Sequence, residues 1–122
     1  MTSTRSLTIL FAEDDPSARE VITIILEMEG YTLVTAHNGS AALATLLRHR
    51  KVELLISDIY MPGGISGIQL AKRGIAAFPE LKVILVSGDH SSSYEDFPTS
   101  TCFLLKPYDR KGLLRAIENV MG

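Results

Sequence analysis

Short apolar runs alternate along the chain with stretches of helical periodicity, and this alternation limits the possible folds more than any other feature. Three of the runs, LTILFA, ELLIS and KVILVS, are almost continuously apolar. Such runs are typical of strands that helices cover on both faces of a parallel sheet. The candidate strands are Leu7 to Ala12, Thr32 to Ala36, Leu54 to Ser57, Val83 to Val86 and Phe103 to Leu105. The pattern predicts an α/β fold, a doubly wound five-stranded parallel sheet with helices on both faces.

The stretches between the runs predict helices. We expect the first helix to begin with Asp15 as N-cap and Pro16 at its first position, and to end at Gly30. The interval from His90 to Thr101 is rich in serine and threonine, so a fourth helix there should be short or irregular. The apolar positions at helical spacing are Val21, Ile24, Ile25 and Met28, then Leu43, Leu46 and Leu47, then Ala71, Gly74, Ile75 and Phe78, and finally Leu113, Leu114, Ile117, Val120 and Met121.

The length and the net charge of the chain exclude several classes of function. With 122 residues the chain has room for one domain, which we expect to span residues 1–122. A formal net charge of -2 argues against direct binding to nucleic acid or to an anionic membrane surface. The single cysteine, Cys102, excludes an internal disulfide and a structural zinc site, and no signal peptide or membrane-spanning run is present, so we expect a cytoplasmic protein.

Polar residues follow four of the candidate strands. Glu13, Asp14 and Asp15 come after the first, Asp58 after the third, Ser87 after the fourth and Lys106 after the fifth. Because ligands of doubly wound sheets bind beyond the carboxyl ends of the strands, these side chains should converge. Carboxylates, a hydroxyl and an amine, with no His or Cys, suit a hard cation and a phosphoryl group better than acyl transfer or redox chemistry.

Each of these residues also has a simpler interpretation. Asp15 is best explained as the helix cap, and Asp58 alone could be only a turn former. Ser87 could simply begin a turn, and a lone lysine at position 106 would most often be solvated. Glu13 and Asp14 precede the cap, where adjacent carboxylates repel and a bound cation is the simplest compensation. Lys106 ends an apolar strand, and its ammonium needs an anionic partner there. Their joint occurrence therefore favours a site over separate structural roles.

Four segments together resemble the receiver domain of two-component response regulators. They are Ile-Leu-Phe-Ala-Glu-Asp-Asp-Pro-Ser at 9–17, Asp-Ile-Tyr-Met-Pro-Gly at 58–63, Val-Ser-Gly at 86–88 and Leu-Lys-Pro-Tyr at 105–108. The resemblance covers nearly the whole chain and implies the flavodoxin-like strand order 2-1-3-4-5, which the alternation alone does not give. The loop from Met61 to Gly67 resembles those of receivers in hybrid sensor kinases, and single-domain regulators are also similar.

The resemblance implies a role for each site residue. Asp58 would accept a phosphoryl group from a histidine kinase or a histidine phosphotransferase. Glu13, Asp14, Asp58 and the main-chain carbonyl of Tyr60 would hold Mg2+, or Mn2+ in its place. Such a protein is a phosphoprotein of bacterial phosphorelay signalling and not an enzyme with a separate substrate, although the aspartyl phosphate could hydrolyse.

The remaining roles concern the phosphoryl group and its readout. Ser87 and Lys106 would contact its oxygens, with a cis peptide bond before Pro107. Ser87 and Phe103 would form the switch that alters a protein-binding face, while Tyr60 and Asp89 would tune the lifetime of the signal. Exposed residues of the first helix, namely Ser17, Ala18 and Val21, would contact the kinase.

Other functions stay open at this point. The runner-up is a pseudo-receiver that binds its partner without phosphorylation, and an aspartate-based phosphohydrolase is a third possibility. The phosphohydrolase would need a second acid at the position of Tyr60. We expect a monomer or weak dimer that signals by binding a downstream protein, which the sequence does not identify. A stand-alone regulator, a phosphate shuttle and a receiver excised from a longer chain fit equally well.

Overall fold

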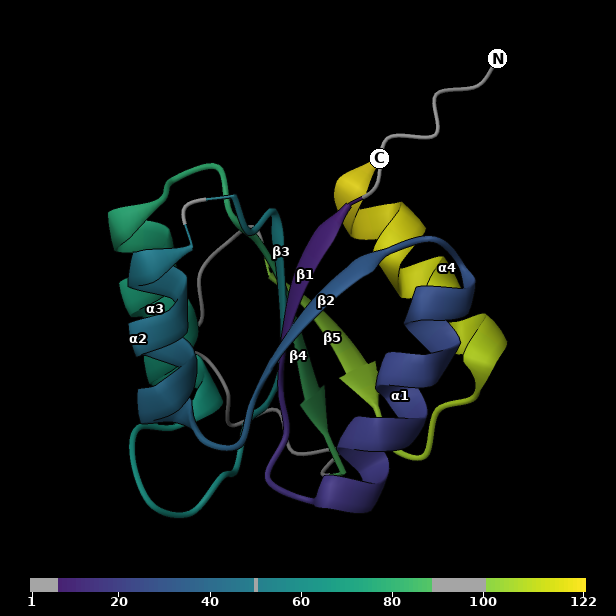
Figure 1. Ribbon diagram of the computed structural model, residues 1–122, viewed down its shortest axis with the longest axis horizontal. Helices are drawn as coiled ribbons and strands as arrows, with labels where there is room; N and C mark the ends of the chain where they lie inside the picture. The colour runs from purple at the N-terminus through teal and green to yellow at the C-terminus, as the bar shows by residue number, and fades with distance from the viewer. Residues whose placement is uncertain (1–6, 50, 89–100) are drawn as a thin grey trace.

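The computed structural model describes residues 7–49, 51–88 and 101–122. Its centre is a parallel sheet of five strands in the order β2-β1-β3-β4-β5 (Figure 1), as the resemblance implies. The strands are β1 (Thr8–Ala12), β2 (Thr32–Ala36), β3 (Leu54–Asp58), β4 (Lys82–Ser87) and β5 (Thr101–Leu105). The doubly wound α/β class is therefore confirmed.

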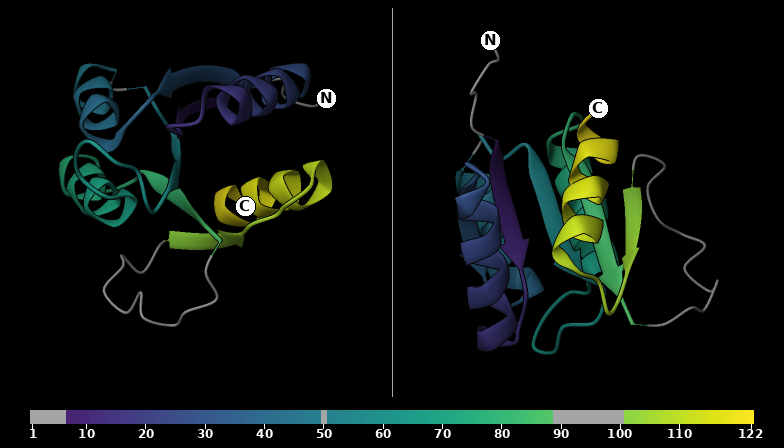
Figure 2. Two further views of the ribbon diagram at one scale, coloured as in Figure 1. Left: turned by 90° about the horizontal axis from the view of Figure 1, so that it is seen from below. Right: turned by 90° about the vertical axis from the view of Figure 1, so that its right-hand side faces the viewer.

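The helices cover the sheet on both faces. They are α1 (Pro16–Met28), α2 (Gly39–Arg48), α3 (Gly67–Ala77) and α4 (Arg110–Met121). Figure 2 shows α1 and α4 on one face and α2 and α3 on the other. Within the described residues, no helix combines the length and the apolar character needed to cross a membrane.

The central strand β3 shows why the strand sequences are apolar without a break. All five of its residues are buried. Leu55 packs into the core beneath α2 and α3, whereas Leu54 and Ile56 pack into the core beneath α1 and α4. Since successive side chains point to opposite faces, a strand with a core on each side must be apolar at every position.

The strand ends extend beyond the predicted limits at polar residues. Asp58 and Ser87 are the last residues of β3 and β4, and Thr101 is the first residue of β5. Thr101 was expected within the helical interval, and this part of the prediction is wrong, because Thr101 pairs with Val83 in the sheet. The remainder of the expected short helix, residues 90–100, lies outside the described residues.

The predicted helix ends are confirmed, but the apolar positions at helical spacing do not all lie on the buried face of α1. Asp15 caps α1, Pro16 starts it, and Gly30 follows its end with φ of 94°. The buried positions of α1 are Ile22 and Leu26, whereas Val21, Ile24 and Met28 are exposed. The apolar positions of this helix exceed one face, so the spacing did not decide which face meets the sheet. Leu47 of α2 is likewise exposed rather than buried.

Candidate functional site

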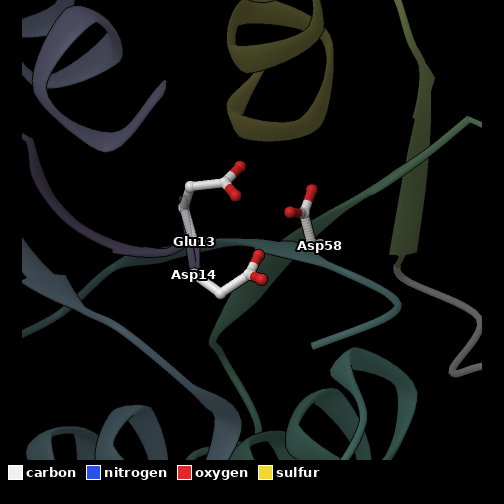
Figure 3. A group of neighbouring side chains, drawn as sticks. All are labelled: Glu13, Asp14 and Asp58. Atoms are coloured by element: carbon white, nitrogen blue, oxygen red, sulfur yellow. The ribbon is translucent and has the colours of Figure 1, made fainter. Parts of the chain in front are cut away.

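The carboxyl ends of β1 and β3 bring three acidic side chains together. Glu13 and Asp14 follow β1, and Asp58 ends β3, which pairs directly with β1. Figure 3 shows the three carboxylates turned toward one another. One carboxylate oxygen of each lies within 4.8 Å of the others. The predicted convergence of these residues is confirmed.

The loop after β1 holds Glu13 in a buried position. Its amide donates to the carbonyl of Ala36 at 3.0 Å, which continues the pairing with β2. Its carboxylate accepts the amide of Asp15 at 3.1 Å. Burial raises the pKa of Glu13 to about 7, and the neighbouring Asp58 carboxylate adds to this against the opposing effects of the Asp15 amide and Lys106. A buried carboxylate beside another is costly to ionise unless a cation is near.

Asp58 is the last residue of β3, and contacts of its main-chain carbonyl hold it in place. Only 5% of the residue is exposed. The hydroxyl of Ser57 donates to the Asp58 carbonyl at 2.8 Å. A side chain at Gly67, the first residue of α3, would overlap with that same carbonyl. This close approach explains the glycine, which brings the start of α3 directly against the end of β3.

Lys106 approaches Asp58 from the end of β5. Its Nζ lies 3.1 Å from Oδ1 of Asp58, and its amide donates to the carbonyl of Ser87 at 2.8 Å. Burial acts to lower the pKa of Lys106, but the hydrogen bond and charge of Asp58 outweigh it, so the pKa lies above its ordinary value. The Lys106–Pro107 bond is cis, as the resemblance implies. Lys106 therefore has the anionic partner that its place in the sequence requires.

Of the other predicted residues, Ser87 lies at this edge of the sheet and Phe103 lies in the middle of β5. Ser87 is buried at the end of β4, where it pairs with Leu105. The Tyr60 side chain is 67% exposed, and Phe103 is 38% exposed on β5. Phe103 is thus not a fully buried core aromatic. Asp89 lies outside the described residues.

The structure adds two residues that the sequence did not single out for this edge. Burial, reinforced by the charges of Asp58 and Glu13, raises the pKa of Tyr108 to about 12. Tyr108 also lines an open groove of ≈ 470 Å³ between α1 and the loop after β5. Arg19 of α1 donates through Nη1 to the carbonyl of Glu13 at 2.8 Å. The signal for Arg19 was its place four residues after the N-cap, one helical turn above the loop.

The chemistry of the donor set fits a hard divalent cation. Every candidate ligand is an oxygen, which Mg2+ and Mn2+ prefer over nitrogen or sulfur. The three carboxylates lie close together in a partly buried setting, and burial, with a smaller contribution from Asp58, raises the pKa of Glu13. Asp58 also lies beside the Lys106 ammonium, so an anionic group joined to Asp58 would meet the positive charge of this side chain.

Comparison with known proteins decides the family. The chain matches the family described as the response regulator receiver domain over residues 9–118. The chain belongs to this family. Among relatives of the receiver, the response regulator receiver protein CpdR of Brucella abortus is 33% identical over 116 residues, which are 93% of this chain and 95% of that protein. The transcriptional regulatory protein GlrR of Escherichia coli is 33% identical over 118 residues, but the receiver spans only 26% of its length.

Solved structures agree on the fold of the receiver. The receiver domain of the hybrid histidine kinase CckA has 34% sequence identity and a TM-score of 0.80, covering 94% of this chain and 99% of that one. A response regulator receiver protein from Sinorhizobium medicae has a TM-score of 0.89 at 20% identity, covering 98% and 97% of the two chains. The second likeness concerns the fold alone.

Proposed function

We propose that this receiver accepts a phosphoryl group on Asp58 from a histidine kinase or histidine phosphotransferase, with Mg2+ or Mn2+ held by Glu13, Asp14 and Asp58. One observation carries the proposal. Asp58 is buried between two further carboxylates and the ammonium of Lys106, 3.1 Å from Oδ1. Structural ion pairs do not need three converging carboxylates, whereas an acceptor that binds a divalent cation does.

The transfer itself is a displacement at phosphorus. A carboxylate oxygen of Asp58 forms the new P–O bond while the P–N bond of the donor phosphohistidine breaks and the imidazole leaves with the bonding electron pair. The attack brings two anions together, so the charge on the phosphoryl oxygens must be offset. A cation held by Glu13, Asp14 and Asp58 would supply part of this compensation. Lys106 supplies the rest from Nζ, since its raised pKa keeps it protonated at neutral pH.

Ser87 and Phe103 are the proposed readout of the modified state. Ser87 ends β4, and its carbonyl accepts the amide of Lys106. The two residues proposed to contact the phosphoryl oxygens are thus joined through one backbone hydrogen bond. Phe103 lies on β5 two residues before Leu105, the partner of Ser87 in the sheet. A shift of Ser87 toward the phosphoryl group would change the packing around Phe103. Repacking of this kind is a population shift between two states.

The surface beside the site is suited to the phosphoryl donor. Ser17, Ala18 and Val21 of α1 line the open groove together with Lys106 and Tyr108. Val21 is 54% exposed although it is apolar. A donor that docks on this part of α1 would place its phosphohistidine next to Asp58. The proposed activity is acceptance of the group and binding of a partner, not turnover of a separate substrate.

A beryllofluoride titration in the presence of Mg2+, followed by amide NMR, tests the proposal without the kinase. Wild-type receiver should show shifts at Asp58, Ser87 and Phe103. Asp58→Asn should abolish them, because the amide cannot bond the beryllium. Glu80→Gln, which removes an exposed carboxylate at the opposite edge of the sheet, serves as the matched control and should respond like the wild type. Absence of shifts in the wild type would overturn phosphoacceptance and favour a pseudo-receiver that binds its partner constitutively.

A further inference from the structure

Arg19 joins the first full turn of α1 to the loop that carries the acidic residues. Its side chain is half-buried, and Nη1 donates to the carbonyl oxygen of Glu13 at 2.8 Å. Its own amide donates to the carbonyl of Asp15 at 2.9 Å. One residue thus binds the loop on both sides of Asp14, through its backbone and through its guanidinium.

The bonded carbonyl belongs to the peptide that links Glu13 to Asp14. A peptide unit is planar, so fixing its oxygen also fixes the direction of the Asp14 amide and of the chain that leaves it. The amide of Glu13 is held from the other side by Ala36 at 3.0 Å. Because Glu13 is held at both its amide and its carbonyl, the backbone that leads into Asp14 has a fixed direction, and this direction determines the position of the Asp14 Cβ.

Asp14 depends on this backbone control more than its neighbours do. Its side chain is exposed, and within residues 7–49, 51–88 and 101–122 no hydrogen bond or ion pair holds its carboxylate. Glu13, by contrast, is anchored by the amide of Asp15, and Asp58 by Lys106. The Asp14 side chain points toward Glu13 and Asp58 (Figure 3), and this direction therefore depends on the loop that Arg19 holds through the Glu13 carbonyl.

We propose that Arg19 is a positioning residue for the metal site, which holds the Glu13–Asp14 peptide so that the Asp14 carboxylate faces Glu13 and Asp58. The inference rests on the proposed function, because it assigns Arg19 a part in binding the divalent cation. Outer residues that orient metal ligands typically change affinity 10- to 100-fold when removed.

Charge and positioning predict effects of opposite sign on cation binding. The guanidinium carries a positive charge and bonds the carbonyl between Glu13 and Asp14, so its removal by electrostatics alone would strengthen Mg2+ binding. Loss of the bond to the Glu13 carbonyl would release the turn and weaken Mg2+ binding. The direction of the change in Kd thus separates a positioning residue from a merely neighbouring charge.

The test is a Mg2+ titration of the metal-free protein followed by amide NMR. Arg19→Met keeps the apolar stem and removes the donors, and its Kd should rise about tenfold. Arg19→Lys keeps one charged donor and should recover part of the affinity. Arg115→Met removes the same charge from an exposed position on α4 and should leave the Kd within about twofold of the wild type. In the absence of Mg2+, the Asp14 amide should become more mobile in Arg19→Met only.

The outcomes separate this inference from the proposed function. If the wild type responds clearly to Mg2+ and Arg19→Met binds Mg2+ with the same or a lower Kd, the role of Arg19 is overturned and the metal site is left intact. A wild type that shows no Mg2+ response at Glu13, Asp14 or Asp58 would overturn the metal site and the role of Arg19 toward it. A folding defect in Arg19→Met would lower the midpoint of unfolding. In that case Arg19→Lys is the deciding variant: partial recovery of the Mg2+ affinity would support the positioning role, and no recovery would overturn it.

Discussion

Glu13 links the protonation of the site to the stability of the receiver. Its pKa of about 7 in the folded protein lies above the ordinary value of 4.5, chiefly because the group is buried. The folded state therefore holds this proton more tightly than the unfolded state. The stability that results is fully present below pH 4.5 and is lost as the pH rises through 7.

We expect Glu13→Gln to remove this pH dependence. The amide keeps an oxygen that can accept the Asp15 amide, so the change isolates ionisation from hydrogen bonding. Without Mg2+, the wild type should lose stability relative to Glu13→Gln between about pH 4.5 and pH 7. Urea unfolding of both proteins at intervals across that range measures the difference. A difference that stays constant with pH would show that Glu13 titrates at its ordinary value.

Asp58 is the second buried carboxylate of the site. It is buried among carboxylates, while its cationic partner Lys106 is 43% exposed in its side chain and loses less when left alone. We expect Asp58→Asn to raise the free energy of unfolding by about 1 kcal/mol at pH 8 in the absence of Mg2+. Chemical denaturation checks this. A decrease would mean that the ion pair with Lys106 outweighs the repulsion from Glu13 and Asp14.

Residues that carry the charges of the candidate site were predictable from the sequence, and residues that act through the backbone were not. Glu13, Asp58 and Lys106 follow apolar strands and carry charges that need compensation, which is visible in the sequence alone. Arg19 binds a carbonyl, and every residue has one. Nothing in the identity of its partner could therefore mark Arg19. The spacing of one helical turn became meaningful only with the path of the loop.

The helix α1 shows the same division at the scale of an element. Its ends follow from Asp15, Pro16 and Gly30, since each has a local effect on the backbone. Its buried face does not follow, because the sequence VITIIL places apolar residues around more than half of the helix. The choice of face depends on where the sheet lies, which is tertiary information.

Truncation should destabilise the protein much more on the buried face of α1 than on its exposed face. Leu26→Ala removes a side chain that is fully buried against the sheet, and we expect a loss of about 2–5 kcal/mol in the free energy of unfolding. Ile24→Ala, from a residue 52% exposed, should change it by less than about 0.5 kcal/mol. Urea unfolding measures both. A large loss in Ile24→Ala would mean that this face is covered, for example by a second copy of the chain.

At the scale of the whole molecule, the alternation of strand and helix determined the fold class but not the strand order. Continuous apolar strands require helices on both faces, and this requirement holds for several orders of the same strands. The order 2-1-3-4-5 came from the resemblance, and it is this order that pairs β1 with β3 and brings Asp58 to Glu13 and Asp14. The position of the site is therefore a property of the complete topology.

This topology predicts that a cation at the site stabilises the whole receiver. The proposed ligands come from β1 and β3, which are paired at the centre of the sheet, so they cannot separate without disrupting that centre. Binding energy should then add to global unfolding rather than to local opening. At a Mg2+ concentration one hundred times the Kd we expect a gain of about 2.7 kcal/mol.

Thermal and urea unfolding with increasing Mg2+ measure this gain. Asp14→Asn should abolish it, because the amide provides a weaker ligand without charge, while Glu80→Gln should retain it in full. Hydrogen exchange should slow together in β1, β3 and β4, since these strands are hydrogen-bonded side by side. A gain that persists in Asp14→Asn would place the stabilising ion elsewhere. Slower exchange confined to the loop after β1 would show that the cation orders that loop without linking the two strands.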